Sequence, residues 1–334
     1  MSRFTIGIVG GSGYIGSALA DYLSRTFNVK VLDKSSLPRV FKGRNIEYRS
    51  CNIVEFEEVK RALKNVDIVI HTAIVQIPLI NEQKKLGYEV NIVGTQNICK
   101  VVNDTKPIKG MILSGTWHVF GERELKGVID EEFGFRPDMV EERARLYALS
   151  KIAQEVIVRM YDELSDKTYS VIRMGTVLGE GMPEKTAAKI FIARGIRGEP
   201  LTPYKHSLYR PMLYVDINDV CRAFESYTLR ILNDEANKNA NSLGHVINLY
   251  WPKPITIIEL SYMIRNSIVR LTKGRIRPEM EVIEKGLPAF YTVQSKEQIK
   301  VNVNKALNWL RLKMLTDPEE SIERIVKNCL SENR

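Results

Sequence analysis

The sequence predicts a doubly wound α/β fold, in which helices cover both faces of a parallel sheet. Short runs rich in Val and Ile alternate with longer amphipathic stretches through the first half of the chain. The first apolar run ends in a glycine-rich turn that opens a helix-like stretch. This alternation is typical of β-α-β units with right-handed crossovers.

The elements follow from the periodicity of their apolar residues. Short apolar runs indicate strands that are buried on both faces, and apolar residues three or four positions apart indicate amphipathic helices. We expect strands at 4–11, 29–33, 45–53, 66–74, 110–116, 170–179 and 245–251. We expect helices at 17–27, 55–66, 90–104, 147–164, 186–198, 215–232 and 255–271, and a loop at 200–212.

The alternation loosens after Gly175, which predicts a second, smaller unit. Prolines separate short segments toward the C-terminus. We assign residues 1–175 and about 212–250 to the main sheet domain, and about 176–211 and 251–334 to a smaller C-terminal α/β lobe. Because ligands of doubly wound sheets bind beyond the carboxyl ends of the strands, we expect this lobe to cap that crevice and bind the substrate.

Composition and charge exclude several classes of protein. The 334 residues are 44% hydrophobic and 27% charged, which is too apolar for a disordered chain. No apolar run approaches the ~20 residues of a membrane span, and the N-terminal segment does not resemble a signal peptide. We therefore expect a cytoplasmic protein with no membrane contact. Its four cysteines are far apart, and we expect buried thiols rather than disulfides.

The protein is basic, with a formal net charge of +9. Its lysines and arginines are interspersed with acidic residues and form no polybasic block. We therefore expect no nucleic-acid partner. An anionic small molecule is compatible with this balance of charge.

A glycine-rich turn joins the first expected strand to the first expected helix. Gly10, Gly13 and Gly16 satisfy G-x-x-G-x-x-G, and Gly11, Gly13 and Gly16 satisfy G-x-G-x-x-G. Glycine tolerates the positive φ angles of such a turn, and without Cβ atoms a pyrophosphate can approach the helix N-terminus. The position between strand and helix makes this the dinucleotide fingerprint of a Rossmann domain.

An acidic residue, Asp33, ends the second expected strand. A carboxylate at this position accepts hydrogen bonds from a ribose diol and repels a 2′-phosphate, so NAD is favoured over NADP as the cofactor. Lys34 follows directly and slightly weakens that preference.

Tyr147 is the only one of the 14 tyrosines with a lysine, Lys151, four positions later. Residues at this spacing share one face of a helix. A nearby ammonium stabilises a phenolate and lowers a pKa that starts near ~10, which makes Tyr a usable acid and base. The alternative interpretation is a half-buried Tyr beside a solvated Lys.

With these motifs the chain resembles the extended short-chain dehydrogenases/reductases, specifically the NAD-dependent sugar-nucleotide epimerase/dehydratase group. The resemblance runs along most of the chain and is most specific in the first half. Besides the glycine turn, the matching segments are Asn52-Ile53, His71 to Ile74, Asn91 to Thr95, Thr116 to Gly121, Arg173 to Gly179, Arg210 to Asp216 and Val303 to Ala306.

The resemblance implies that Thr116, Tyr147 and Lys151 are catalytic. Tyr147 would take the proton of a substrate hydroxyl, Thr116 would hydrogen-bond the same oxygen, and Lys151 would bind the nicotinamide ribose. The implied cofactor contacts are Gly10, Gly13, Tyr14, Ile15, Gly16, Asp33, Lys34, Asn52, Ile53, Thr72, Ala73, Asn91, Tyr147 and Lys151. The implied substrate contacts are Thr116, Tyr147, Thr176 and Arg210, and the family arginine matched by Arg210 binds the nucleotide diphosphate.

Departures from the family pattern bear on the reaction. Family dehydratases carry Asp-Glu directly after the catalytic Thr, whereas this chain has Trp117-His118, so a 4,6-dehydratase is disfavoured. Thr176 replaces an Asn that contacts the sugar diphosphate. We therefore favour an epimerase of the UDP-glucose/UDP-galactose type. The alternatives are an NAD-dependent dehydrogenase or reductase of another small alcohol or ketone, and a non-catalytic dinucleotide-binding protein.

The four histidines are too scattered to predict a metal site. His118 lies near the expected site, where we expect a structural role or a simple hydrogen bond. Lys185 is expected on a solvated face. The apolar helix around Ala144 to Met160 suggests a homodimer contact, with burial against its own sheet as the alternative.

Overall fold

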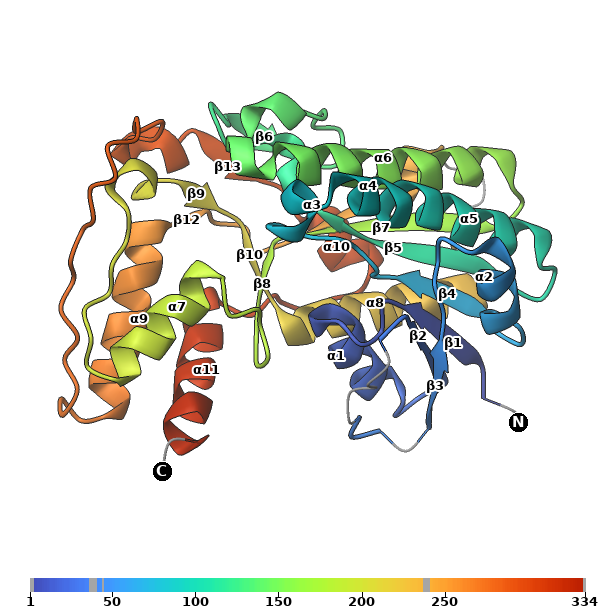
Figure 1. Cartoon of the computed structure of the whole chain (residues 1–334), viewed down its shortest axis with the longest axis horizontal. Helices are drawn as coiled ribbons and strands as arrows, with labels where there is room; N and C mark the ends of the chain where they lie inside the picture. The colour runs from blue at the N-terminus through green and yellow to red at the C-terminus, as the bar shows by residue number, and fades with distance from the viewer. Residues whose placement is uncertain (1–2, 36–40, 44, 237–240, 333–334) are drawn as a thin grey trace.

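A seven-stranded parallel sheet forms the centre of the protein (Figure 1). The computed structural model describes residues 3–35, 41–43, 45–236 and 241–332. The strand order is β11-β7-β5-β4-β1-β2-β3, which confirms the doubly wound fold. The strands are β1 (Thr5–Val9), β2 (Asn28–Asp33), β3 (Ile46–Ser50), β4 (Ile68–His71), β5 (Gly110–Thr116), β7 (Thr168–Met174) and β11 (Val246–Leu249). Apart from β7, each lies within a predicted strand or differs from it by one residue at an end.

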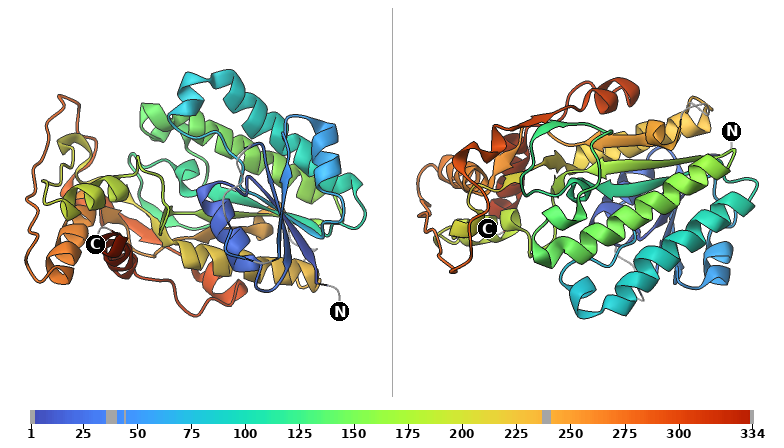
Figure 2. Two further views of the ribbon diagram at one scale, coloured as in Figure 1. Left: turned by 60° about the horizontal axis from the view of Figure 1, so that its bottom comes forward. Right: turned by 90° about the horizontal axis from the view of Figure 1, so that it is seen from above.

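Helices cover both faces of this sheet (Figure 2). One face carries α1 (Tyr14–Leu23) and α8 (Ile217–Leu232), and the other carries α2 (Phe56–Ala62), α5 (Thr95–Asp104) and α6 (Glu142–Leu164). Alternate residues of the strands face the two layers. In β4, Ile68 and Ile70 belong to the core beneath α1 and α8, whereas Val69 belongs to the core beneath α2 and α5. Burial on both faces explains why the central strands are mostly apolar runs, whereas the edge strand β3 has no buried residue.

Several predicted elements differ from the structure. The expected helix 17–27 lies at Tyr14–Leu23, and the expected helix 55–66 ends at Ala62. The expected strand 170–179 is divided at Gly175: β7 stays in the main sheet, and β8 (Thr176–Leu178) pairs with β10 (Tyr214–Asp216) instead. The expected helix 90–104 is regular only from Thr95, after a π-helical turn at Glu89–Gly94. The expected helix 147–164 begins five residues earlier, at Glu142.

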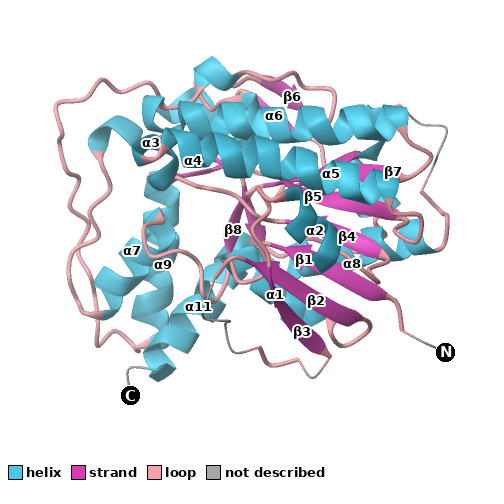
Figure 3. Cartoon of the chain, turned by 45° about the vertical axis from the view of Figure 1, so that its right-hand side comes forward, coloured by secondary structure: helices cyan, strands magenta, loops and turns pink. Residues whose placement is uncertain are grey.

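The C-terminal lobe is built from α7 (Ala187–Ile196), α9 (Ile257–Leu271) and α11 (Pro318–Glu332), which pack against one another (Figure 3). Side chains cap the starts of α7, α8 and α9. Thr186 caps α7, Asp216 caps α8, and Thr256 with Glu259 forms a capping box on α9.

The remaining elements are short. The strands are β6 (Gly127–Ile129), β9 (Pro211–Met212), β12 (Ile255–Thr256) and β13 (Ile299–Val301), which form the pairs β12-β9 and β13-β6. The short helices are α3 (Leu79–Glu82), α4 (Lys84–Tyr88) and α10 (Asn304–Trp309), and 3-10 turns lie at Trp117–Phe120, Pro137–Met139, Lys205–Ser207, Ser242–His245 and Val293–Lys296. The division of the chain into two domains stays a prediction.

The cysteines lie as expected: three are buried, Cys329 is half-buried, and all four are free thiols. Among the described residues, no helix is both long enough and apolar enough to cross a membrane.

Candidate active site

The glycine turn is packed too closely to tolerate side chains at two of its positions. Gly10 has a φ of +78°, and a Cβ there would lie 2.4 Å from the backbone nitrogen of Ala73. A Cβ on Gly16 would lie 2.4 Å from the carbonyl oxygen of Gly10. The turn therefore brings the start of α1 directly against the end of β4.

The N-terminal end of α1 is open to an anion. Gly13 is its N-cap and provides no side-chain cap, and the first turn holds no acidic residue. The positive end of the helix dipole and its free N–H groups therefore face the adjoining cavity, as a pyrophosphate requires.

Asp33 closes the other side of the turn. Its Oδ2 accepts a hydrogen bond from the backbone N–H of Ser12 at 3.0 Å, and its Oδ1 accepts one from Ser35 at 3.1 Å. The carboxylate is thereby fixed at the end of β2 next to the glycine turn. The exposed side chain of Lys34 lies on the same cavity.

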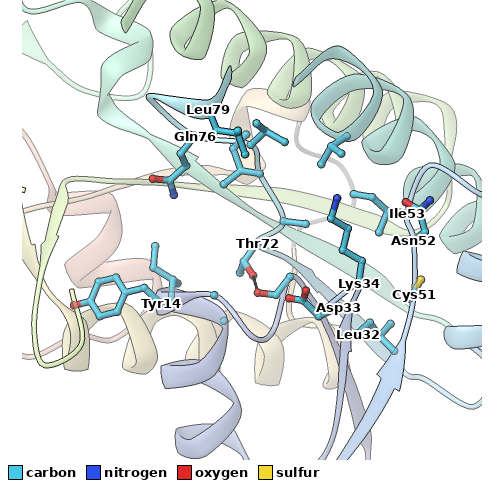
Figure 4. A pocket seen from close by; sticks show the side chains of 18 of the residues that line it. Tyr14, Leu32, Asp33, Lys34, Cys51, Asn52, Ile53, Thr72, Gln76 and Leu79 are labelled. Carbon is cyan, nitrogen blue, oxygen red and sulfur yellow. Dashed lines mark hydrogen bonds between the residues drawn. The ribbon is translucent and has the colours of Figure 1, made fainter. Parts of the chain in front are cut away.

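A cavity of about 330 Å³ collects most of the predicted cofactor contacts (Figure 4). Its lining includes Gly10, Gly13, Tyr14, Ile15, Gly16, Asp33, Lys34, Asn52, Ile53, Thr72 and Ala73. The Tyr14 hydroxyl is buried and has no hydrogen-bond partner among the described residues. The glycine cradle and the open helix end fit an extended, anionic dinucleotide.

Two of the predicted cofactor residues also hold the site together. The Thr72 hydroxyl donates to the carbonyl oxygens of Val9 and Gly10, at 2.9 and 3.1 Å. Asn91 is fully buried and does not line the cavity: its amide hydrogen-bonds the backbone of Val75 and the hydroxyl of Ser150. Asn91 thus ties the segment after β4 to α6, next to Lys151.

The three predicted catalytic residues meet at the carboxyl end of β5. Thr116 is the last residue of β5, and Tyr147 and Lys151 lie on one face of α6. Lys151 is 4% exposed and donates from Nζ to the carbonyl oxygen of Ser114 at 2.9 Å. All three line one cavity of about 180 Å³.

Burial governs the protonation of this group. It raises the pKa of Tyr147 to about 12, an effect that a hydrogen bond with Thr116 partly offsets. It lowers the pKa of Lys151 to about 7, an effect that the nearby Glu155 carboxylate partly offsets. The expected lowering of the Tyr147 pKa by a neighbouring ammonium is therefore wrong for this structure, because desolvation dominates.

Arg210 lies in an ion-pair network rather than alone. Its guanidinium pairs with Glu141 and stands 3.9 Å from Glu122, and Arg143 donates to the other oxygen of Glu141 at 2.8 Å. Burial raises the pKa of Glu122, whereas Arg210 and Arg143 outweigh burial at Glu141 and hold its pKa below the usual range. Arg210, Glu141 and Arg143 line a third cavity of about 830 Å³.

The three cavities adjoin one another. We call the cavity lined by Thr116, Tyr147 and Lys151 the catalytic cavity, and the cavity lined by Gly10, Gly13 and Gly16 the glycine-turn cavity. The two share Tyr14, Thr72 and Gln76. The catalytic cavity shares His118, Thr176 and Thr186 with the large cavity, which reaches into the C-terminal lobe. Thr116, Tyr147 and Lys151 thus lie between the glycine-turn cavity and the large cavity lined by Arg143 and Arg210.

Sequence reasoning missed several of these residues. Glu141 and Glu122 belong to no motif, and only the fold brings them to Arg210. Lys185 is exposed, as expected, and it also lines the large cavity. The Thr176 hydroxyl accepts a hydrogen bond from the Trp117 indole at 3.4 Å. Within the described part of the chain, no cluster of three or more His, Cys, Asp or Glu side chains is placed to hold a metal ion.

This fold and site define a dinucleotide-dependent enzyme of the Rossmann class, with a Tyr and a Lys beside the cofactor space. A family model for the NAD-dependent epimerase/dehydratase family matches residues 6–247. The chain belongs to this family, whose dependence on NAD confirms the predicted cofactor. The match ends just where the sequence resemblance becomes diffuse.

Individual relatives are distant. A protein of Methanocaldococcus jannaschii described as a putative UDP-glucose 4-epimerase is 25% identical over 276 residues, which cover 78% of this chain and 81% of that protein. The uncharacterized protein y4nG of Sinorhizobium fredii is 31% identical over 175 residues, which cover 52% of this chain and only 41% of that protein.

The architecture also matches a solved enzyme. The crystal structure of the UDP-glucose 4-epimerase of Thermotoga maritima, with UDP-glucose, superposes with a TM-score of 0.78 at 21% identity. The superposition covers 99% of this chain and 100% of that one. This likeness establishes the fold of the whole chain, the C-terminal lobe included.

Proposed function

We propose that this protein is an NAD-dependent epimerase that acts on a nucleotide sugar by transient oxidation of a secondary hydroxyl. The observation that carries the proposal is the position of Thr116, Tyr147 and Lys151 between two adjoining cavities. The glycine-turn cavity suits the cofactor, and the large cavity suits the substrate. Bound NAD would supply the acceptor and donor of the hydride.

The residues that line the first cavity would hold the cofactor. The N–H groups at the start of α1 would face its pyrophosphate. Asp33 would accept hydrogen bonds from the adenosine ribose, and Asn52 and Ile53 would contact the adenine. Thr72 and Ala73 would flank the turn, Asn91 would act by supporting Lys151, and Lys151 itself would bind the nicotinamide ribose.

Tyr147 would move the proton of the reaction. Since burial raises its pKa to about 12, Tyr147 holds its proton at neutral pH and is suited to return it to a ketone oxygen. Removal of a proton from the substrate hydroxyl requires the phenolate. A hydrogen bond from Thr116 would stabilise the phenolate. After the proton has moved to Tyr147, the Thr116 hydroxyl would donate to the substrate oxygen instead.

The large cavity supports an anionic substrate. Arg143, Lys185, Arg210 and Lys285 line it, together with one carboxylate, Glu141. A sugar linked to a nucleoside diphosphate would bring about two negative charges to these cations. We propose Thr176 and Arg210 as its contacts, alongside Thr116 and Tyr147.

The catalytic cavity favours epimerisation over dehydration. Loss of water needs an acid and a base beside the sugar. None of the described residues that line the catalytic cavity is Asp or Glu. A dehydrogenase of another small alcohol is the second candidate, because Thr176 already accepts a hydrogen bond from Trp117 and its hydroxyl offers no amide pair to a diphosphate.

Interconversion of UDP-glucose and UDP-galactose tests this function. The protein would be mixed with either sugar nucleotide and a trace of NAD, and the anomeric protons would be followed by NMR. We expect both mixtures to converge on one ratio without net NADH, and Tyr147→Phe to abolish the exchange. Steady formation of NADH with a simple alcohol, and no interconversion, would favour the dehydrogenase.

A homodimer through α6 stays a prediction. This helix leaves Leu149, Val156, Met160 and Leu164 exposed by 40% to 77%, whereas Ala144 and Ala148 are buried. Light scattering after gel filtration would distinguish a dimer from a monomer. Met160→Asp should yield the monomer if this face forms the contact.

A further inference from the structure

The proposed mechanism assigns no role to His118, a polar side chain next to Thr116 and Tyr147. Its ring lies between Trp117 and Tyr147, with ring centroids 4.7 Å from the indole and 5.9 Å from the phenol. Its Nδ1 lies 3.2 Å from Oγ1 of Thr116. His118 also lines both the catalytic cavity and the large cavity.

The Thr116 hydroxyl has two lone pairs and a single proton to share. One lone pair accepts the backbone N–H of His118 at 3.3 Å, which caps the 3-10 turn after β5. The second lone pair and the proton of Thr116 are then left for two neighbours, the Nδ1 of His118 and the Tyr147 hydroxyl. The tautomer of His118 therefore decides which of them receives the proton.

The two tautomers have opposite consequences. If Nδ1 is the acceptor, Thr116 gives its proton to His118 and can only accept from Tyr147, which favours the neutral phenol. If Nδ1 carries the proton, it fills the second lone pair of Thr116. The Thr116 proton then points to the phenolate or to the substrate oxygen, where a catalyst needs it.

The charges around His118 favour the second arrangement. Arg210 and Arg143 exert the largest charge effects on the ring, opposed by a smaller effect of Glu141. Both arginines line the large cavity, whereas Thr116 lines the catalytic one. Nδ1 is the ring nitrogen beside Thr116, so the arginines would act mainly on Nε2, where positive charge favours a lone pair. The proton of a neutral ring then lies on Nδ1. Burial and the two arginines lower the pKa of His118 to about 3, which keeps the ring neutral.

We propose that His118 is a positioning residue that donates from Nδ1 to Thr116, and so directs the Thr116 hydroxyl proton toward Tyr147 and the substrate oxygen. No motif marks this role, because His118 stands where family dehydratases carry a carboxylate. The arrangement of protons does not depend on the identity of the substrate.

NMR of the histidine rings tests the tautomer without any turnover. Long-range ¹H–¹⁵N spectra of the ¹⁵N-labelled protein with NAD would contain four histidines, and His118→Asn would identify the signals of His118 by their loss. We expect a neutral ring protonated at Nδ1 at pH 7. A ring protonated at Nε2, or a charged ring, would overturn the proposal.

Two other histidines calibrate the spectrum. His245 places Nδ1 2.6 Å from a carboxylate oxygen of Asp162 and should carry a proton there. His71 should carry its proton on Nε2, 2.9 Å from Thr95 Oγ1, because Thr95 donates its own proton to the Asn91 carbonyl oxygen. The His118 pattern should match that of His245 at Nδ1 and differ from that of His71.

A pair of amide variants tests the consequence for catalysis and rests on the proposed function. The amide nitrogen of Asn stands as many bonds from Cα as Nδ1 does, whereas the longer Gln places its amide at the position of Nε2. His118→Gln should lower kcat about tenfold, as loss of one hydrogen bond does, and raise the midpoint of its pH profile while KM changes little.

His118→Asn should restore most of kcat and the original pH midpoint. Equal losses in both variants, with an unchanged pH midpoint, would indicate a merely structural role and contradict the proposal. If the wild-type protein fails to interconvert the sugar nucleotides while the NMR pattern is as expected, the proposed function fails and the assignment of His118 stands.

Discussion

The cofactor side and the substrate side of this active site are built in different ways. The proposed cofactor side uses backbone N–H groups, glycines without room for a Cβ, and residues less far apart in sequence, such as Asp33 and Ser12, which are 21 positions apart. The substrate side uses charged side chains that the fold brings together, such as Arg210 and Glu141, which are 69 positions apart. The first therefore depends on backbone geometry, and the second on side-chain charges that only the fold brings together.

Tyr147, where the two sides meet, should produce the largest effect. Tyr147→Phe removes the proton donor without changing the shape of the cavity, so kcat should fall about a thousandfold. The affinity for NAD, measured by calorimetry, should stay within about twofold because the glycine turn is untouched. Unchanged turnover in this variant would exclude the proposed chemistry.

On the substrate side, the ion-pair network should respond strongly. Arg210→Met leaves the carboxylates of Glu141 and Glu122 without their cation, which should lower the free energy of unfolding by about 3 kcal/mol. Arg143→Ala is the matched control, and it should cost less than about 0.5 kcal/mol because its side chain is 61% exposed.

Adding Glu141→Gln to Arg210→Met should recover part of the loss, since one uncompensated carboxylate is removed. Urea unfolding of the three variants measures these differences. Equal stability of the Arg210→Met and Arg143→Ala proteins would refute the view that the buried network organises this side.

On the cofactor side, one methyl group should be enough to disturb the turn. Gly16→Ala forces its Cβ against the Gly10 carbonyl oxygen, and displacement of the turn should weaken NAD binding about thirtyfold. Gly134→Ala is the control, because a Cβ there meets no atom within 4 Å. If both variants bind NAD equally well, close packing of the turn does not define the cofactor site.

The smallest effect concerns buried histidines on the two sides. Burial lowers the pKa of both His71 and His118 to about 3, so the unfolded state binds more protons below pH 6.5. The free energy of unfolding should therefore fall as the pH falls, by about 1 kcal/mol per histidine between pH 7 and 5.5. His71→Asn and His118→Asn should each remove the contribution of one histidine to the pH dependence of the free energy of unfolding, measured by urea titrations. An unchanged pH dependence would show that these rings are not held neutral.

The contrast between the two sides also explains what the sequence alone could predict. Most strands of the sheet were predictable because burial on both faces makes them apolar runs. The exception is the edge strand β3, which has no buried residue. The glycine turn, Asp33 and the Tyr147–Lys151 pair were predictable because each depends on short spacings along the chain. The division of the expected strand 170–179 was not, since β8 leaves the sheet to pair with the distant β10.

The electrostatics of the site could not be predicted from spacing. The i, i+4 relation places Lys151 on the same helix face as Tyr147, but the pKa of each group depends on how deeply both are buried. Glu141 and Glu122 became visible only when the fold placed them beside Arg210. His118 was predicted to be structural, and the proposal for it rests on its contact with Thr116.

The central claim is that one hydride leaves and returns to the same carbon of the substrate within a single site. UDP-galactose deuterated at carbon 4 of the sugar tests it most directly, with mass spectrometry and NMR of the UDP-glucose formed. For the proposed epimerase, we expect the deuterium to stay at carbon 4 through many turnovers and no NADH to accumulate. Deuterium lost from the sugar, or a ketone product formed with NADH, would contradict it.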